Sequence, residues 1–262
     1  MDDQDVAALE RANYASMSGL VAATPGSDLL VRDDVTLIRS LLFPMADMNH
    51  ACLLCPSPER AEPLLDEIIR YFRRRRLPVN VCLSPACSPA DLPERLLSRG
   101  FRRREPPEAW LTLDLYPDWQ PPPLASAGVA CRRVGEGNAR GFARVYLAAF
   151  GLPALLAPVA ALLLRRSLRL PSMHYYVALV EDRPAGVCLW HCHGEIACLG
   201  AVGVLPAYRG HRVATSVVIR AAEEAAQQGM GLMMTQTLHP RLADVLQGHG
   251  FRQAFVRTYY AL

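Results

Sequence analysis

The sequence predicts a mixed α/β (α+β) protein of two similar halves, each with a central mixed sheet flanked by helices. Three observations support this fold class. Apolar residues repeat with strand-like and helix-like periods in alternation along the chain. The pattern near the end of the chain also occurs in the first half, and a proline-rich stretch separates the two. The chain has 262 residues, of which 51% are hydrophobic, so it can bury a substantial core.

The break between the halves is the stretch "YPDWQPPPLASAG", from Tyr116 to Gly128. Its four prolines and several small residues allow little regular structure. We therefore expect a first domain over residues 1–116, a linker over 117–128 and a second domain over 129–262.

In the first half, apolar spacing at i, i+3, i+4, i+7, i+8 and i+11 predicts a helix over residues 61–72. The remaining apolar runs predict strands over 79–84 and 109–115, and a short helix lies between them over 91–101. The residues from 214 to 225 repeat the first spacing, and the sequence Gly-Phe-Arg at residue 100 recurs at residue 250. These repeats indicate an internal duplication.

The second half begins with a predicted strand and two helices, the second of them bent or broken at Pro158. Three apolar strands follow, and Gly200 and Gly203 in the third predict a bulge or a close approach by a ligand. The half closes with a helix that ends at Gly229, a strand, a short helix and a last strand. By residue number, the elements of this half are expected at 129–134, 138–150, 154–170, 173–182, 185–192, 194–205, 214–228, 232–237, 240–250 and 251–262.

Charge and the N-terminal composition exclude several classes of protein. The net charge of +3 is too small to indicate a nucleic-acid-binding protein. No apolar run reaches the roughly 18 residues of a membrane-spanning helix, and the acidic N-terminus does not resemble a signal peptide. We therefore expect a cytoplasmic protein with no membrane partner. The arginine run Arg73–Arg76 is interpreted as the solvated end of a helix, and a binding patch is the alternative.

Cysteine and histidine residues offer a metal site as a minority interpretation. Without a secretory signal, the eight cysteines are expected to be free thiols, mostly buried and unreactive. The pair Cys52 and Cys55 has zinc-like spacing, but a second pair with suitable spacing is missing. The segment His191–His193 is expected at a strand end. We expect no metal, and we expect Cys198 to be a core thiol rather than a nucleophile.

The stretch "VGVLPAYRGHRVAT", Val202 to Thr215, joins a predicted strand to a predicted helix. The first turn of a helix presents unpaired N–H groups and the positive end of the helix dipole. A glycine before that turn lets an anion approach, and basic neighbours add charge. Arg209, Gly210, His211 and Arg212 therefore predict an anion cradle suited to a pyrophosphate, against the alternative of a surface turn.

The segment "VLPAYRGHRVA" resembles the V-x-P-x-x-R-G-x-G-x-A signature of the GCN5-related N-acetyltransferase (GNAT) family. The closing "HGF" and the order of elements from residue 129 to residue 262 are also similar to this family. The first half resembles a degenerate copy, because "LLCPSPERA" at the equivalent join lacks the arginine and the glycine. The resemblance implies the acyl-CoA N-acyltransferase (GNAT) fold, present as two tandem GNAT-like domains.

The resemblance also implies acetyl-CoA as co-substrate, with the turn on its pyrophosphate and the main chain of the preceding strand on its pantetheine arm. The expected coenzyme-binding residues are Val202, Gly203, Val204, Arg209, Gly210, His211, Arg212, Val213, Ala214 and Thr215. The family usually has glycine at the position of Arg212. An arginine at this position can instead donate hydrogen bonds from its guanidinium to the phosphates.

Catalysis, by the same resemblance, is direct attack of a neutral amine on the thioester within a ternary complex. A backbone N–H near Val204 would polarise the carbonyl. Glu195 is the candidate general base, acting through water, and a plain surface charge is the alternative. Leu246 occupies the position where the family often has a tyrosine that serves as the general acid.

Three functions remain open at this point. The chain is expected to be an N-acetyltransferase for a small amine or an amino-terminal group. The alternatives are a coenzyme A-binding module with weak or no catalysis, which Leu246 favours, and a transferase for longer acyl-CoAs. The expected partners are coenzyme A and a small-molecule amine acceptor, and the expected assembly is a monomer or homodimer.

Overall fold

The computed structural model describes residues 1–43, 45–116, 119–122 and 128–262. The elements of the first half are α1 (Asp3–Ala23), β1 (Ser27–Val31), β2 (Thr36–Ser40), β3 (His50–Cys52), α2 (Pro58–Arg73), β4 (Asn80–Leu83), α3 (Leu92–Ser98), β5 (Arg102–Arg103) and β6 (Glu108–Asp114). Those of the second half are β7 (Val129–Arg133), α4 (Ala139–Ala149), α5 (Ala157–Ser167), β8 (Met173–Val180), β9 (Arg183–His193), β10 (Ile196–Val204), α6 (Val213–Gln227), β11 (Leu232–Thr237), α7 (Pro240–Gln247) and β12 (Arg252–Ala261). Most of the predicted linker, 117–128, lies outside the described residues.

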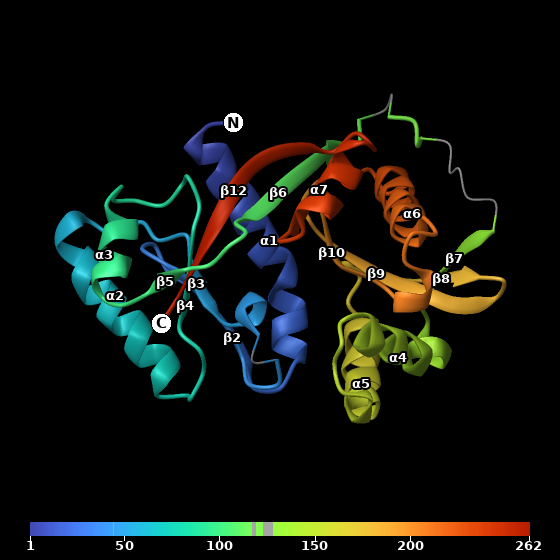
Figure 1. Cartoon of the computed structure of the whole chain (residues 1–262), viewed down its shortest axis with the longest axis horizontal. Helices are drawn as coiled ribbons and strands as arrows, with labels where there is room; N and C mark the ends of the chain where they lie inside the picture. The colour runs from blue at the N-terminus through green and yellow to red at the C-terminus, as the bar shows by residue number, and fades with distance from the viewer. Residues whose placement is uncertain (44, 117–118, 123–127) are drawn as a thin grey trace.

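The strands form one mixed sheet that runs through both halves (Figure 1). Within the described residues its order is β1-β2-β3-β4-β12-β6-β11-β10-β9-β8-β7, and β5 pairs with β12. The pairs β3–β4 and β10–β11 are parallel, and they occupy equivalent places in the two halves. This correspondence supports the predicted duplication, and the mixed sheet agrees with the predicted fold class.

The two halves exchange their last strands. β6 belongs to the first half by sequence, yet it pairs with β11 of the second half along the whole of β11. β12 ends the second half, and its residues 258–261 pair with β4 of the first half. The first part of β12 pairs with β6. The division into domains 1–116 and 129–262 therefore remains a proposal, because each half supplies a strand to the sheet of the other.

Alternation along the strands assigns the helices to the two faces of the sheet. On β10, Ala197 and Leu199 point into the cluster under α6 and α7, whereas Cys198 lies in the cluster under α1. On β4, Val81 packs with α2 and α3, whereas Cys82 packs with α1. The helices α2, α3, α6 and α7 thus cover one face, and α1, α4 and α5 cover the other.

Helix α1 was not predicted from the sequence. It begins with a capping box, in which Asp2 and Asp5 accept hydrogen bonds from each other's backbone N–H groups. Its buried residues include the polar Glu10, Asn13 and Ser16 as well as apolar residues. The helix packs against β1 of the first half and against β9 and β10 of the second, and so it spans both halves.

A buried ionic network joins α1 to the exchanged strands. The Arg257 guanidinium on β12 lies 3.3 Å from the Glu10 carboxylate on α1 and 2.8 Å from the Glu108 carboxylate on β6. It also donates to the Tyr14 hydroxyl at 2.6 Å. The Glu10 carboxylate accepts a further hydrogen bond from Ser84 at 2.5 Å. This network links four segments that are far apart in the sequence.

The structure also bears on the predictions for Pro158, for the arginine run and for the cysteines. Pro158 lies in the first turn of α5 and does not break a helix. The run Arg73–Arg76 begins at the last residue of α2, as predicted. All eight cysteines are free in the described residues. Cys52, Cys82, Cys188 and Cys198 are buried. The prediction that Cys55 is buried was wrong, because its side chain is exposed. No helix in the described ranges has the length and apolarity needed to cross a membrane.

Candidate active site

The predicted bulge in β10 is present and opens the sheet. The register with β9 shifts between Gly200 and Gly203, and Ala201 adopts a left-handed backbone with φ of 48°. The parallel pairing of β10 with β11 ends at Leu199 and Thr235. Beyond Leu199, β10 stays paired with β9 only, and its other edge is free of β11.

Close packing explains the glycine at the end of β10. A β-carbon at Gly203 would lie 2.8 Å from the Phe150 ring and 3.0 Å from the Ala149 side chain. A β-carbon at Gly186 on β9 would lie 2.9 Å from the Gly203 carbonyl oxygen. Such contacts are too short for a real side chain. The end of β10 is therefore fixed between β9 and the C-terminal end of α4.

The backbone N–H of Val204 points toward the free edge. The N–H of Leu205 donates to the Ala185 carbonyl of the β9 side at 2.9 Å. Successive N–H groups of an extended chain point to opposite sides, so the Val204 N–H is directed away from β9. It faces the opening that the divergence of β11 creates. An unpaired donor of this kind can bind a carbonyl oxygen of a ligand.

The turn after β10 leads directly into α6. Gly210 has φ of 84°, and a β-carbon there would meet no atom within 4 Å. Arg212 is also left-handed, with φ of 58°, and α6 begins at Val213 without a side-chain cap. The backbone N–H of Ser216 donates to the Arg212 carbonyl at 2.9 Å, and this is the hydrogen bond that closes the first helical turn. The N–H groups of residues 213–215 therefore have no intrahelical acceptor, and a helix start of this kind suits an anion.

The basic side chains of the turn have different roles. Arg209 folds back and donates to the Val204 and Ala149 carbonyls, each at 3.4 Å. One His211 ring nitrogen lies 3.1 Å from the Arg209 carbonyl oxygen. Arg212 is exposed, and its side chain makes no hydrogen bond or ion pair with the part of the chain that is described. The structure thus brings the predicted cradle residues together, and Arg212 is the one whose charge is free for a ligand.

The structure does not bring Glu195 to this turn. Glu195 lies in the β9–β10 hairpin, and its carbonyl accepts from the N–H of Gly231 at 2.9 Å. Nine residues of strand separate Glu195 from Val204, which corresponds to roughly 30 Å at about 3.3 Å per residue. A single water cannot relay a proton over this distance. We therefore no longer assign Glu195 the role of general base.

Leu246 lies in the core between α7 and the sheet, with 4% of its surface exposed. The side chain at this position can donate no proton. A tyrosine there would have to displace core neighbours, because the buried site is filled by apolar side chains. Within the described residues, the structure therefore supplies no acid at the position where the family often has one.

A buried histidine contact lies on the opposite face of the sheet. One His191 ring nitrogen lies 2.5 Å from the Ser16 hydroxyl of α1, and Ser16 also contacts the Cys198 thiol. Burial lowers the pKa of His191 to about 4 and raises the pKa of Cys198 to about 12. The imidazole is therefore neutral and the thiol protonated near pH 7, as expected for a core thiol. In the described ranges, no group of three or more His, Cys, Asp or Glu residues could hold a metal ion.

Comparisons with known proteins agree with the geometry. Residues 141–251 match the model of the acetyltransferase (GNAT) family. A GCN5-related N-acetyltransferase from Kribbella flavida superposes with a TM-score of 0.66 at 14% identity, over 95% of this chain and 93% of that chain. A search of curated protein sequences gave no match.

Two further solved structures share the fold. One is described as a tandem GNAT protein from the clavulanic acid biosynthesis pathway, with a TM-score of 0.64 at 17% identity, over 91% of this chain and 84% of that chain. The other is a GCN5-related N-acetyltransferase from Sphaerobacter thermophilus, with a TM-score of 0.60 at 15% identity, over 100% of this chain and 93% of that chain. Such identities establish the fold alone.

The family match contains the bulge, the divergence of β10 and β11, and the turn before α6. The predicted resemblance is confirmed for this part of the chain, and the fold is that of GNAT proteins over nearly its whole length. The family model thus identifies a GNAT acetyltransferase domain at residues 141–251, within the second half of the chain.

Proposed function

We propose that this protein is an acetyl-CoA-dependent N-acetyltransferase that acts on a small amine or an amino-terminal group within a ternary complex. The observation that carries the proposal is the free Val204 N–H beside an uncapped helix N-terminus. GNAT proteins use acetyl-CoA, and both features match what this co-substrate requires. The reactive end needs a donor for its carbonyl, and the pyrophosphate needs several N–H groups.

Several features of the turn and of β10 support binding of this co-substrate. The open space at Gly210 lets a phosphate approach the N–H groups of residues 213–215, and Arg212 adds a free guanidinium. The free edge of β10 from Val202 to Val204 offers main-chain groups to an extended arm. Acetyl-CoA supplies the acetyl thioester. The Val204 N–H then polarises its carbonyl, and the cradle holds it against the acceptor amine.

This site relies on positioning and on the backbone donor, because it lacks Glu195 as a base and a tyrosine at Leu246 as an acid. A thiolate leaves readily, since the pKa of a thiol is only about 8.5. We therefore expect slow but real transfer, whose rate rises with pH as the acceptor amine loses its proton. The buried Leu246 is the observation that favours the alternative of a coenzyme A-binding module without turnover.

The test combines binding and turnover. Acetyl-CoA is supplied with a panel of small amines and amino-terminal peptides between about pH 6 and pH 9, and release of free thiol is measured. Gly210→Glu places a carboxylate among the N–H groups and is expected to abolish coenzyme A binding by calorimetry. Gly194→Glu is the matched control, because Gly194 is also left-handed, with φ of 58°, and has equally open space, but it lies in the β9–β10 hairpin.

Unchanged affinity in Gly210→Glu would move the coenzyme site elsewhere. Tight binding with no turnover above hydrolysis, for any acceptor and at any pH, would replace the proposal with the binding module. A preference for longer acyl-CoAs in the same assay would identify the third function.

Arg212→Gly is expected to stabilise the protein and to weaken the coenzyme complex. Removing a left-handed side chain should raise the free energy of unfolding by about 1 kcal/mol. Loss of the guanidinium should lower the affinity for coenzyme A about tenfold to hundredfold and reduce its dependence on salt. Urea unfolding and calorimetry measure the two effects.

Arg76→Gly is the control for this prediction. Arg76 is an exposed, left-handed arginine as well, with φ of 56°, but it lies at the end of α2. The same gain in stability with no change in binding is expected. If Arg212→Gly binds coenzyme A more tightly, Arg212 obstructs the cradle and the assigned role is wrong.

A further inference from the structure

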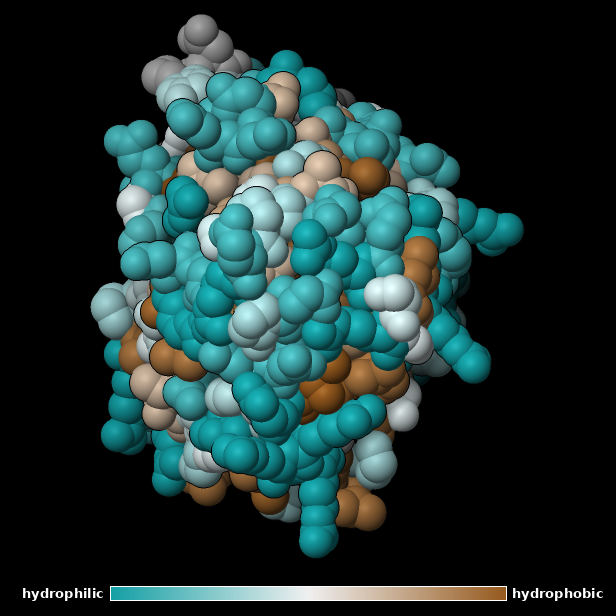
Figure 2. Space-filling model, turned by 90° about the vertical axis from the view of Figure 1, so that its left-hand side faces the viewer, coloured by the Kyte–Doolittle hydropathy of each residue, from teal (hydrophilic) through white to brown (hydrophobic). Residues whose placement is uncertain are grey.

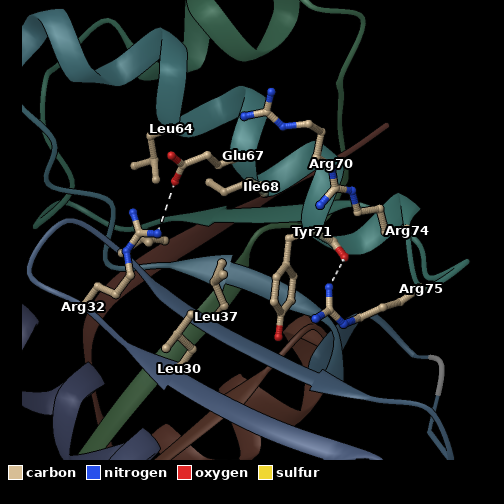
Figure 3. A pocket seen from close by; sticks show the side chains of 11 residues that line it. Leu30, Arg32, Leu37, Leu64, Glu67, Ile68, Arg70, Tyr71, Arg74 and Arg75 are labelled. Carbon is tan, nitrogen blue, oxygen red and sulfur yellow. Dashed lines mark hydrogen bonds and ion pairs between the residues drawn. The ribbon is translucent and has the colours of Figure 1, made fainter.

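A pocket of about 420 Å³ lies in the first half between α2, the edge strand β1 and its neighbour β2 (Figure 3). Apolar side chains from both layers line it, namely the buried Leu37, Leu64 and Ile68 and the exposed Leu30. The volume suits a small ligand. Figure 2, which looks onto the side of the molecule where α2 and α3 lie, shows a mainly hydrophilic surface interrupted by apolar areas.

The rim of the pocket is cationic. Arg32, Arg70, Arg74 and Arg75 line it, whereas Glu67 is the one carboxylate among its lining residues. Glu67 is already engaged, because its carboxylate lies 3.2 Å from the Arg32 guanidinium and 2.8 Å from that of Arg60. Arg32 is also paired with Asp34 at 2.7 Å, so the excess of positive charge beside the apolar recess comes from Arg70, Arg74 and Arg75.

Two of these arginines are free to bind a ligand. The side chains of Arg70 and Arg74 form no hydrogen bond or ion pair with any residue that the structure describes. Arg70 lies in the last turn of α2 and Arg74 follows directly after Arg73, its last residue, so the two are about one helical turn apart and project from the same side. Arg75 is held in place, because it donates to the Tyr71 carbonyl at 2.8 Å and lies 4.1 Å above the Tyr71 ring.

The position of the arginine run Arg73–Arg76 at the end of α2 explains part of the positive charge, but it does not explain why an apolar recess lies beside that charge. Cations complement the dipole at the C-terminal end of a helix, and an exposed arginine such as Arg73 needs no other role. That effect requires no apolar cavity below the charges. The Tyr71 hydroxyl accepts from Arg39 on β2 at 3.1 Å, which ties the helix to the strands and keeps the recess formed.

The pocket is separate from the coenzyme site. It lies along the C-terminal part of α2, whereas a coenzyme site in the first half would lie at the N-terminus of this helix, next to Ser57. Prolines at 56 and 58 remove N–H groups there. The elements that line the pocket, β1, β2 and α2, belong to the half that does not contain the turn before α6; Figure 1 shows these elements apart from α6.

We propose that this pocket binds a small amphipathic anion, with a phosphate or carboxylate head group on Arg70 and Arg74 and an apolar part against the leucine-lined recess. Guanidinium groups bind both kinds of head group through paired N–H donors. The apolar part gains its affinity from removal of hydrocarbon from water. This binding does not depend on the proposed acetyl transfer.

Octyl phosphate and octanoate are the probes, each titrated into the full-length protein by calorimetry below the concentration at which they form micelles. Octylamine and inorganic phosphate serve as comparison compounds that lack the anion or the apolar part. We expect saturable binding of one octyl anion per chain, and no saturation with either comparison compound. The ratio of the two octyl affinities identifies the preferred head group.

Two pairs of variants locate the site. Arg74→Glu should weaken octyl anion binding about tenfold or more, whereas Arg73→Glu, on the same helix but outside the pocket, should change it less than about twofold. Leu30→Asn should weaken binding, whereas the neighbouring Val31→Asn should not, because Val31 points away from the pocket on β1.

Thermal unfolding of all four variants confirms that they are folded, and coenzyme A binding should be unchanged in each. The proposal is wrong if the octyl anions do not saturate, if Arg74→Glu and Arg73→Glu bind them equally, or if coenzyme A displaces them one for one.

Discussion

Replacing Arg257 with methionine is expected to lower the free energy of unfolding by about 3–5 kcal/mol. The side chain of Arg257 is 2% exposed, and the Glu10 side chain is 0% exposed. Without the guanidinium, the Glu10 and Glu108 carboxylates stay buried with no cation between them. Urea unfolding measures the loss. Arg252→Met is the control on the same strand: Arg252 pairs with Asp114 at the surface, where an ion pair contributes at most about 1 kcal/mol.

The loss should depend on pH in a defined direction. Burial raises the pKa of Glu10 above its ordinary value of 4.5, and Arg257 opposes this effect. The pKa of Glu10 should therefore rise further in Arg257→Met. A carboxyl whose pKa is raised by folding stabilises the folded state at low pH, and this contribution disappears as pH rises through the folded pKa. Arg257→Met should thus be less destabilising at pH 5 than at pH 8.

Glu10→Gln combined with Arg257→Met should recover part of the lost stability, because one unpaired buried charge is removed. An equal loss at both pH values, with no recovery in the double variant, would show that the network acts through packing alone.

Residues 129–262 produced alone are expected to show no cooperative unfolding transition. This fragment lacks β6, the strand between β11 and β12. Without β6, the edge of β11 is exposed along its whole length, and Arg257 loses Glu108. Circular dichroism during heating is the measurement. The second half was expected to form a domain of its own, and this experiment decides whether it does.

The control for the fragment is the full-length chain cut by a protease within the linker, 117–128. The exchanged strands should hold the two pieces together, so that they elute as one particle and melt near the temperature of the uncut protein. Separation of the pieces without denaturant, or a folded 129–262 fragment that binds coenzyme A, would show that the exchange is not needed for stability.

Two backbone features near the proposed coenzyme site could be predicted because they are local. Gly200 lies at the bulge in β10 and Gly210 adopts a left-handed backbone, and both features involve residues adjacent in sequence or in the sheet. The close contacts of Gly203 with Ala149 and Phe150 at the end of α4 join segments far apart in sequence, and the sequence did not indicate them. The candidate role of Glu195 does not fit the structure for a different reason. The sequence places Glu195 before the strand and so requires water to relay the proton, but the nine residues of β10 separate its two ends by too great a length for a single water.

Neither helix α1 nor the strand exchange could be predicted from one sequence, and the reasons differ. The buried side of α1 carries Glu10, Asn13 and Ser16, so the apolar period that marks a helix is interrupted by the residues that make its contacts. The apolar alternation of β6 is the same whichever sheet receives it, so the pattern indicates a strand but not its partner. The cationic pocket could not be predicted from the sequence either, because one wall of the recess beside Arg74 is formed by β1 and β2, more than thirty residues earlier in the chain.

The position of β12 between β4 and β6 also sets an order of events during synthesis on the ribosome. The first-half strands β1 to β6 are translated first, and β4 can pair with β3 at that stage, but β4 obtains its second neighbour only when residues 258–261 have left the exit tunnel. Until then the nascent first half has an open sheet edge. The Glu10 and Glu108 carboxylates also lack their ion-pair partner, Arg257. The central part of the sheet, in which β12 lies between β4 and β6, therefore cannot be completed before β12 has been synthesised.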